Sequence, residues 1–280
     1  MEPRNPGTKL AAAGFSALKR AGRRIAMLTA YDYPTAVAEA EAGIDIVLVG
    51  DSVGTNVLGY TSEREVTLDD IAHHVRAVRR GAPATHLLAD LPYGTYRTPA
   101  AALENARRLV DAGADSVKFE GLRLEAVERL VGAGIPVCGH IGLEPQHHEQ
   151  IGVKGKTVED ALRIVGQAKA IAGAGAFLIV LEMIPEELGA LVSAEIAIPT
   201  IGIGAGRGTD GQVLVVTDLL GFNPRNYRHN RRYAELGPTI RQAIGAYRDE
   251  VEGRAFPGPE NASHLSAETI QAVREALDKV

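Results

Sequence analysis

Several short apolar runs of the sequence end in an ionisable or hydroxyl-bearing side chain, and these residue types could carry out metal-assisted chemistry. A lone Asp in such a place is usually the N-cap of the next helix, so the inference depends on the whole set. Carboxylates brought together repel each other, and a bound cation relieves that repulsion. Hard oxygen ligands favour Mg²⁺, which usually takes one or two carboxylates and keeps waters and substrate oxygens. The set is Asp51 with Ser52, Asp90, Lys118 with Glu120, His140 and Glu182.

The elements that must position these residues follow a repeated pattern of helix end, glycine and short apolar strand. The strands read as continuous apolar runs, which is typical of parallel strands buried on both faces. Eight such runs favour a (β/α)8 TIM barrel, in which the strand ends form the active-site face. A doubly wound open sheet is the main alternative, because periodicity does not show closure. The runs are 25–30, 45–50, 86–91, 114–120, 135–141, 177–183, 198–204 and 213–219.

Helical patterns separate most of these runs. One of them, 67–80, starts at a Thr with Asp70 three residues on, a capping pattern. We expect an extra helix over 8–22, covering the barrel floor, and the last barrel helix over 239–253. We therefore predict a catalytic domain over 1–253, followed by a linker and a C-terminal helix over 254–280. The other predicted helices are 98–112, 124–133, 157–171, 185–196 and 266–279.

Composition excludes several other classes of protein. The net charge of −5 and the dispersed basic residues argue against a nucleic-acid partner. The basic stretch 225–232 is interpreted as a solvated loop. Cys138 is the only cysteine, so no intrachain disulfide can form, and we expect it in the core. No apolar run is long enough for a membrane helix, and the N-terminus does not read as a secretory signal, so we expect a cytoplasmic protein.

At the strand-end residues the chain resembles the ketopantoate hydroxymethyltransferase (3-methyl-2-oxobutanoate hydroxymethyltransferase) family. The matching segments run in family order from residue 25 to about residue 223. They include Val49-Gly-Asp-Ser-Val-Gly54, Asp90-Leu-Pro-Tyr-Gly-Thr-Tyr96, Val117-Lys-Phe-Glu-Gly121, Gly139-His-Ile-Gly-Leu-Glu-Pro-Gln146, Leu181-Glu182 and Ile201-Gly-Ile-Gly-Ala-Gly206. The segment from Pro224 to Asn230 departs from the family phrase.

The resemblance implies a reaction and a role for each residue. The enzyme would transfer a hydroxymethyl group from 5,10-methylenetetrahydrofolate to 3-methyl-2-oxobutanoate through a Mg²⁺-stabilised enolate. Asp51 and Asp90 would bind Mg²⁺ with support from Glu120. Ser52 and Lys118 would hold the keto acid together with the two aspartates, and Glu182 would be the general base.

The sequence also permits other interpretations of these residues. His140 could contact the substrate or hydrogen-bond across the rim. A Mg²⁺-dependent 2-oxo acid lyase or mutase of the isocitrate lyase type is the nearest alternative function, although its usual Lys-Lys-Cys-Gly-His loop is absent. A non-catalytic keto-acid or metal-binding protein is the alternative from another class. The resemblance also implies a homo-oligomer, typically a decamer.

Overall fold

Eight parallel strands close into a barrel in sequence order, each hydrogen-bonded to the next and β8 to β1. The computed structural model describes residues 9–147, 152–223 and 227–279. The closure confirms the predicted (β/α)8 barrel and excludes the open sheet. The strands are β1 Ile25–Thr29, β2 Ile46–Val49, β3 His86–Asp90, β4 Ser116–Glu120, β5 Val137–Gly142, β6 Leu178–Glu182, β7 Thr200–Ile203 and β8 Gly211–Leu214.

The helices between the strands form the outer layer. The predicted cap of α3 is present, since Thr67 and Asp70 each accept a hydrogen bond from the other's backbone N–H. Thr98 and Thr157 cap their helices in the same way, by accepting from a backbone N–H in the first turn. These helices are α2 Tyr33–Glu41, α3 Leu68–Gly81, α4 Pro99–Ala112, α5 Leu124–Gly132, α6 Val158–Gly173 and α7 Glu186–Glu195. Two short helical turns, η2 Gly54–Leu58 and η3 Glu63–Glu65, follow β2.

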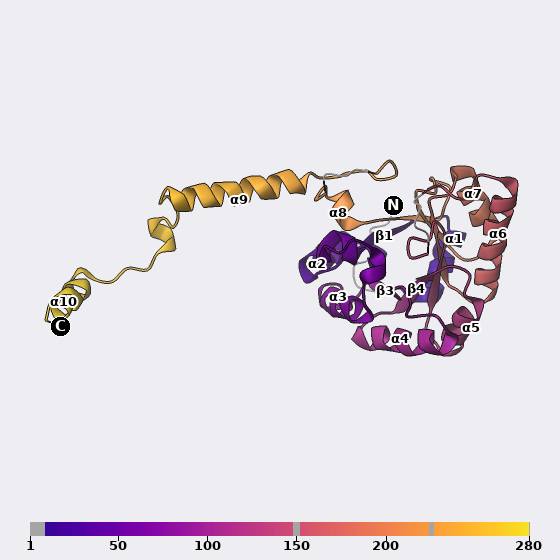
Figure 1. The fold of residues 1–280 in the computed structure, drawn as a ribbon, viewed down its shortest axis with the longest axis horizontal. Helices are drawn as coiled ribbons and strands as arrows, with labels where there is room; N and C mark the ends of the chain where they lie inside the picture. The colour runs from indigo at the N-terminus through magenta and orange to yellow at the C-terminus, as the bar shows by residue number, and fades with distance from the viewer. Residues whose placement is uncertain (1–8, 148–151, 224–226, 280) are drawn as a thin grey trace.

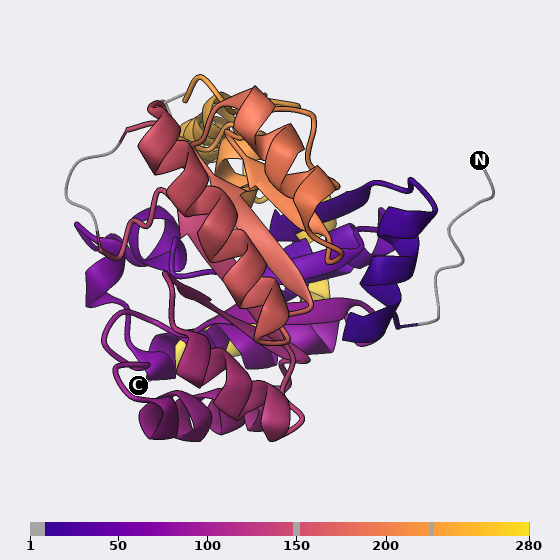
Figure 2. The same ribbon diagram turned by 90° about the vertical axis from the view of Figure 1, so that its right-hand side faces the viewer.

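The N-terminal segment covers one end of the barrel, as predicted. It is shorter than the predicted 8–22 helix, with a turn η1 over Ala12–Gly14 and α1 over Phe15–Arg20. Phe15 is fully buried among inward-facing strand residues and meets the His86 ring edge-on at 5.1 Å. Figure 2 shows these indigo N-terminal elements at one end of the barrel. The predicted site residues, which lie toward the C-terminal ends of the strands, are therefore at the opposite end.

The eighth predicted strand is wrong over most of its length. The strand β8 ends at Leu214, and Val216–Leu219 forms the short helix α8. A short apolar run does not by itself distinguish a buried helix from a strand. The linkage between β7 and β8 contains no helix in its described residues, as the glycine-rich sequence indicates.

The last barrel helix is predicted in the right place but does not pack on the barrel. Helix α9, Leu236–Glu252, projects away from it, and η4 (Pro259–Asn261) and α10 (Ala267–Leu277) lie farther out along the same arm (Figure 1). Ile244 and Tyr247 of α9 are more than half exposed. The domain boundary at residue 253 stays a prediction. No helix among the described residues is long and apolar enough to cross a membrane.

Candidate active site

A cavity of about 580 Å³ opens at the C-terminal ends of the strands. Every site residue predicted from the sequence lines it: Asp51, Ser52, Asp90, Lys118, Glu120, His140 and Glu182. Each residue lies within the last three residues of a barrel strand or just after its end, which explains why they meet. A cavity of this size is typical of a site for a small organic molecule.

Strand register places Asp90 beside Lys118. The two residues are direct partners in the β3–β4 ladder, and Lys118 Nζ lies 3.0 Å from Asp90 Oδ1. The other oxygen, Oδ2, accepts a hydrogen bond from the backbone N–H of Asp51 at 3.1 Å. All three side chains are less than a tenth exposed. The lysine charge thus lies beside two buried carboxylates.

Gln146 links the carboxylates of two different strands. Its side-chain Nε2 donates to Asp51 Oδ2 at 2.6 Å, and its backbone N–H donates to Glu120 Oε2 at 2.9 Å. Its side-chain oxygen accepts from the Tyr96 hydroxyl, and the residue is fully buried. No role of Gln146 is predicted from the sequence. Gln146 is the last residue of the Gly139–Gln146 motif. Membership of that motif is the only feature of the sequence that could have indicated a role for it.

His140 lies between the two glutamates of the rim. Its Nδ1 is 3.7 Å from Glu120 Oε1, and its Nε2 is 3.1 Å from Glu182 Oε2. The second contact has the distance of an ion pair, although its directions are not those of a hydrogen bond. The Glu120 side chain is 3% exposed and that of Glu182 is 18% exposed. Glu182 is therefore more accessible than Glu120 to a molecule bound in the cavity.

Ser52 faces the cavity beside a buried tyrosine. Its Oγ lies 2.8 Å from the Tyr31 hydroxyl. Burial raises the pKa of the Tyr31 phenol, and the Ser52 hydrogen bond offsets only part of this effect. Tyr31 remains a neutral hydroxyl that can hold the serine side chain in place.

Burial and like charges determine the protonation of the acidic groups. Burial, followed by the nearby Asp90, raises the pKa of Asp51 to about 7. Burial and then Asp51 raise the pKa of Glu120 well above its usual value. Burial alone would lower the pKa of Lys118, yet Asp90, Asp51 and Glu120 together raise it above its usual value. The three carboxylates therefore favour the charged form of Lys118.

The Asp51 and Asp90 pair fits a hard divalent cation. Both carboxylates are buried and adjacent, and the partner of Asp90 Oδ1 among the described residues is the Lys118 ammonium, at 3.0 Å. Among the described residues, no three His, Cys, Asp or Glu side chains are grouped so as to hold a metal ion. Mg²⁺ commonly uses one or two protein carboxylates and completes its shell with water and substrate. The pair therefore suffices for Mg²⁺, and direct ligation by Glu120 stays a prediction.

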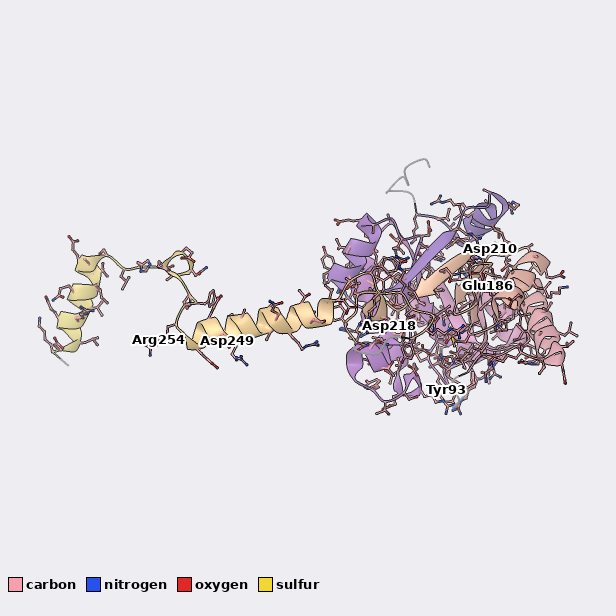
Figure 3. All side chains as sticks on the ribbon, turned by 90° about the horizontal axis from the view of Figure 1, so that it is seen from above. Tyr93, Glu186, Asp210, Asp218, Asp249 and Arg254 are labelled. Atoms are coloured by element: carbon pink, nitrogen blue, oxygen red, sulfur yellow. The ribbon has the colours of Figure 1, made fainter. Side chains whose placement is uncertain are left out.

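The outer half of the cavity contains residues that are not predicted from the sequence. Asn56 Oδ1 accepts hydrogen bonds from Thr217 Oγ1 at 2.8 Å and from Asn223 Nδ2 at 3.1 Å. Asp218 Oδ2 accepts from Asn230 Nδ2 at 2.9 Å. Asp218, labelled in Figure 3, lies on the side of the barrel from which α9 departs. These contacts attach Asn223 and Asn230 to residues that line the cavity.

The basic stretch 225–232 is more than the solvated loop that its composition suggests. Tyr227, Arg228 and His229 line the cavity. Residues 225 and 226 lie outside the described residues. A loop's approach to a distant site is not visible in local charge or periodicity, so the sequence offered no signal. By contrast, Cys138 is fully buried, as expected, and burial raises the pKa of its thiol to about 12.

Comparisons with known proteins agree on one family. The model of the family described as ketopantoate hydroxymethyltransferase matches residues 9–259. The 3-methyl-2-oxobutanoate hydroxymethyltransferase of Chloroflexus aurantiacus is 46% identical over 264 residues, which cover 92% of this chain and 94% of that protein. The protein of the same name from Desulfotalea psychrophila is 47% identical over 256 residues, covering 88% and 91%.

Solved structures show the same fold at low sequence identity. A 2,3-dimethylmalate lyase, described as a PEP mutase/isocitrate lyase superfamily member, superposes with a TM-score of 0.55 at 16% identity. The match covers 96% of each chain. This likeness supports the barrel architecture and carries no information about the reaction.

Proposed function

Because the chain belongs to the ketopantoate hydroxymethyltransferase family and has an intact rim of charged residues, we propose that it makes ketopantoate (2-dehydropantoate) from 3-methyl-2-oxobutanoate. The hydroxymethyl group would come from 5,10-methylenetetrahydrofolate, with one water consumed and tetrahydrofolate released. The observation that carries the proposal is the meeting of Asp51, Asp90, Lys118 and Glu182 in one cavity. Such a reaction is a step of pantothenate synthesis.

The proposed role of the inner residues is to bind and polarise the keto acid. Asp51 and Asp90 would hold Mg²⁺, which when bound supplies Lewis-acid polarisation of the keto oxygen. Lys118, whose charged form the nearby carboxylates favour, would stabilise the negative charge that develops on that oxygen. Ser52, held by Tyr31, would donate a hydrogen bond to the substrate.

Glu182 is the proposed general base at C3 of the keto acid. A base must face the substrate, and Glu182 is the more accessible of the two rim glutamates. Burial favours the protonated form of Glu120, so that residue is a poorer candidate. His140, 3.1 Å from the Glu182 carboxylate, would orient it and stabilise its charge. The C3 carbanion electrons then form the bond to the one-carbon unit.

The experiment separates removal of the C3 proton from transfer of the hydroxymethyl group. We expect wild-type protein with Mg²⁺ to exchange the C3 proton of 3-methyl-2-oxobutanoate in D2O without folate. It should also form ketopantoate when methylenetetrahydrofolate is added. Glu182→Gln should lower the exchange rate by about 10²–10⁴-fold, the usual contribution of a general base, and leave keto-acid binding largely intact. Persistent exchange in this variant contradicts the role of Glu182, and no turnover by folded wild-type protein contradicts the function.

The alternative functions gain no specific support from the site. The fold likeness to 2,3-dimethylmalate lyase is equally compatible with a lyase or mutase. The family match, however, covers residues 9–259 and concerns a transferase. Incubation with 2-oxo acid lyase substrates is the direct check, and we expect no carbon–carbon cleavage.

We also propose that the chain forms a homo-oligomer. Helix α9 carries exposed apolar side chains, including Ile244 at 63% and Tyr247 at 58%, and projects from its own barrel (Figure 1). Such a surface favours burial against a second copy. The decamer implied by the family resemblance is the expected state. Sedimentation velocity should show it, and Ile244→Asp should shift the distribution toward smaller species; an unchanged distribution contradicts a role for α9.

A further inference from the structure

The cavity is larger than the inner residues alone require. A volume of about 580 Å³ lies in the range that holds a drug-sized molecule, whereas the keto acid is a small branched acid. The keto acid would lie against the inner set of Asp51, Asp90, Lys118 and Glu182. The outer half therefore has room for most of a second, larger molecule.

The wall of the outer half includes Tyr227, Arg228 and His229, and residues on either side of these three are attached by hydrogen bonds. Asn223 bonds to Asn56, Asn230 bonds to Asp218, and Arg232 Nη2 donates to the backbone oxygen of Asn223 at 2.7 Å. Between these attachments, the rings of Tyr227 and His229 stack at 5.8 Å with 17° between their planes. Two stacked rings at a cavity wall offer an aromatic surface to a planar ligand.

A glycine allows His229 to come close to the barrel. Gly204 has a left-handed φ of +64°, and a Cβ built on it would lie 3.4 Å from His229 Cβ and 2.6 Å from Met183 Sδ. The imidazole is thus placed next to the β6 and β7 ends. His229 is therefore part of the cavity wall.

The charges of the lining residues identify one group that could receive an anion. In the described lining, the lysine and arginine side chains are Lys118 and Arg228. Lys118 is paired with Asp90, whereas Arg228 is exposed and forms no ion pair with a described residue. The other charged groups of the outer half, Glu63 and Asp218, are acidic and would repel an anion. In the outer half of the cavity, an anionic group is therefore directed to Arg228.

We infer that Arg228 binds the glutamyl carboxylate tail of the folate co-substrate, with the Tyr227–His229 ring pair beside its aromatic part. This inference rests on the proposed function and adds the residues that recognise the donor. An arginine fork matches a carboxylate with two parallel hydrogen bonds. No bond is made or broken in this step, because Arg228 acts only in binding and positioning.

The experiment compares two donors that differ only in the tail. One is 5,10-methylenetetrahydrofolate, and the other is 5,10-methylenetetrahydropteroate, which lacks the glutamate. The variants are Arg228→Ala and the matched control Arg231→Ala, whose guanidinium lies 5.1 Å from the Tyr233 ring centroid and does not line the cavity. Donor-free C3 exchange reports on the inner half of the cavity and serves as the check that both variants fold.

In Arg228→Ala, we expect the KM for the glutamylated donor to rise about tenfold, equal to about 1.4 kcal/mol. The KM for the pteroate donor should change little, so the preference for the glutamate tail is lost. Arg231→Ala should keep the wild-type preference. If wild type turns over and Arg228→Ala keeps that preference, the inference is wrong and the proposed function stands. If wild type neither exchanges C3 nor turns over, the proposed function fails and the inference fails with it.

Discussion

Glu39, on the buried side of helix α2, is expected to make the stability of the protein depend on pH. It is only 4% exposed, and neither carboxylate oxygen receives a hydrogen bond in the described structure. Burial, followed by the charge of Asp32, raises its pKa from the ordinary 4.5 to about 8. The folded protein therefore favours the neutral carboxyl.

The size of the effect follows from the two pKa values. In the unfolded chain Glu39 ionises near pH 4.5, whereas in the folded protein it ionises near pH 8. Between these values folding takes up a proton, so the free energy of unfolding falls as pH rises. The contribution of Glu39 to the free energy of unfolding is fully retained below pH 4.5 and reaches its lowest level above pH 8. One pKa unit corresponds to about 1.4 kcal/mol, so the total loss from this group is about 3–5 kcal/mol.

Urea unfolding at fixed protein concentration tests this reasoning. We expect Glu39→Gln, which cannot ionise, to gain stability over wild type progressively between pH 5 and pH 8.5. The matched control is Glu41→Gln, because Glu41 lies on the same helix and is exposed. Its curve should run parallel to that of wild type. Parallel curves for Glu39→Gln as well would refute the argument, since Glu39 would then ionise alike in both states.

Two further substitutions have clear expected outcomes. Gln146→Leu removes the amide that donates to Asp51, and the Mg²⁺ concentration for half-maximal activity should rise about 10–100-fold in a metal titration. Gly204→Ala places a methyl carbon 2.6 Å from Met183 Sδ in a left-handed residue, so it should lower the thermal midpoint. Its control, Gly166→Ala, meets no atom within 4 Å inside α6 and should be neutral or stabilising. An unchanged Mg²⁺ requirement, or equal midpoints for both alanines, contradicts these expectations.

The barrel and its inner rim could be predicted because each depends on local sequence. A parallel strand reads as an apolar run, and a barrel brings all the strand ends to one face. Asp90 and Lys118 each lie near the end of a recognisable run, and the barrel then makes them ladder partners. The contact between these two residues could therefore be predicted without knowledge of side-chain packing.

The features that were missed depend on tertiary placement. Gln146 lies in a loop, and nothing local indicates that its amide turns toward Asp51. Helix α9 has the periodicity of a barrel helix, and only the structure shows it away from the barrel. Tyr227–His229 approach the cavity through contacts of Asn56 and Asp218 with residues on either side of them. Local composition contains none of these long-range constraints.

The absence of a preformed metal cage in the described residues is consistent with the proposed chemistry. Lys118 supplies one positive charge beside Asp51 and Asp90, so this buried trio carries an excess negative charge when both aspartates are ionised. A divalent cation would reverse the sign of that excess, and an anionic keto acid would then be attracted to the same place. Because Mg²⁺ needs few protein ligands, the substrate oxygens would complete its shell. A more complete set of carboxylate ligands would hold the metal without substrate and leave it less able to polarise a carbonyl. The two-aspartate arrangement therefore favours a site whose full coordination forms only when the keto acid binds.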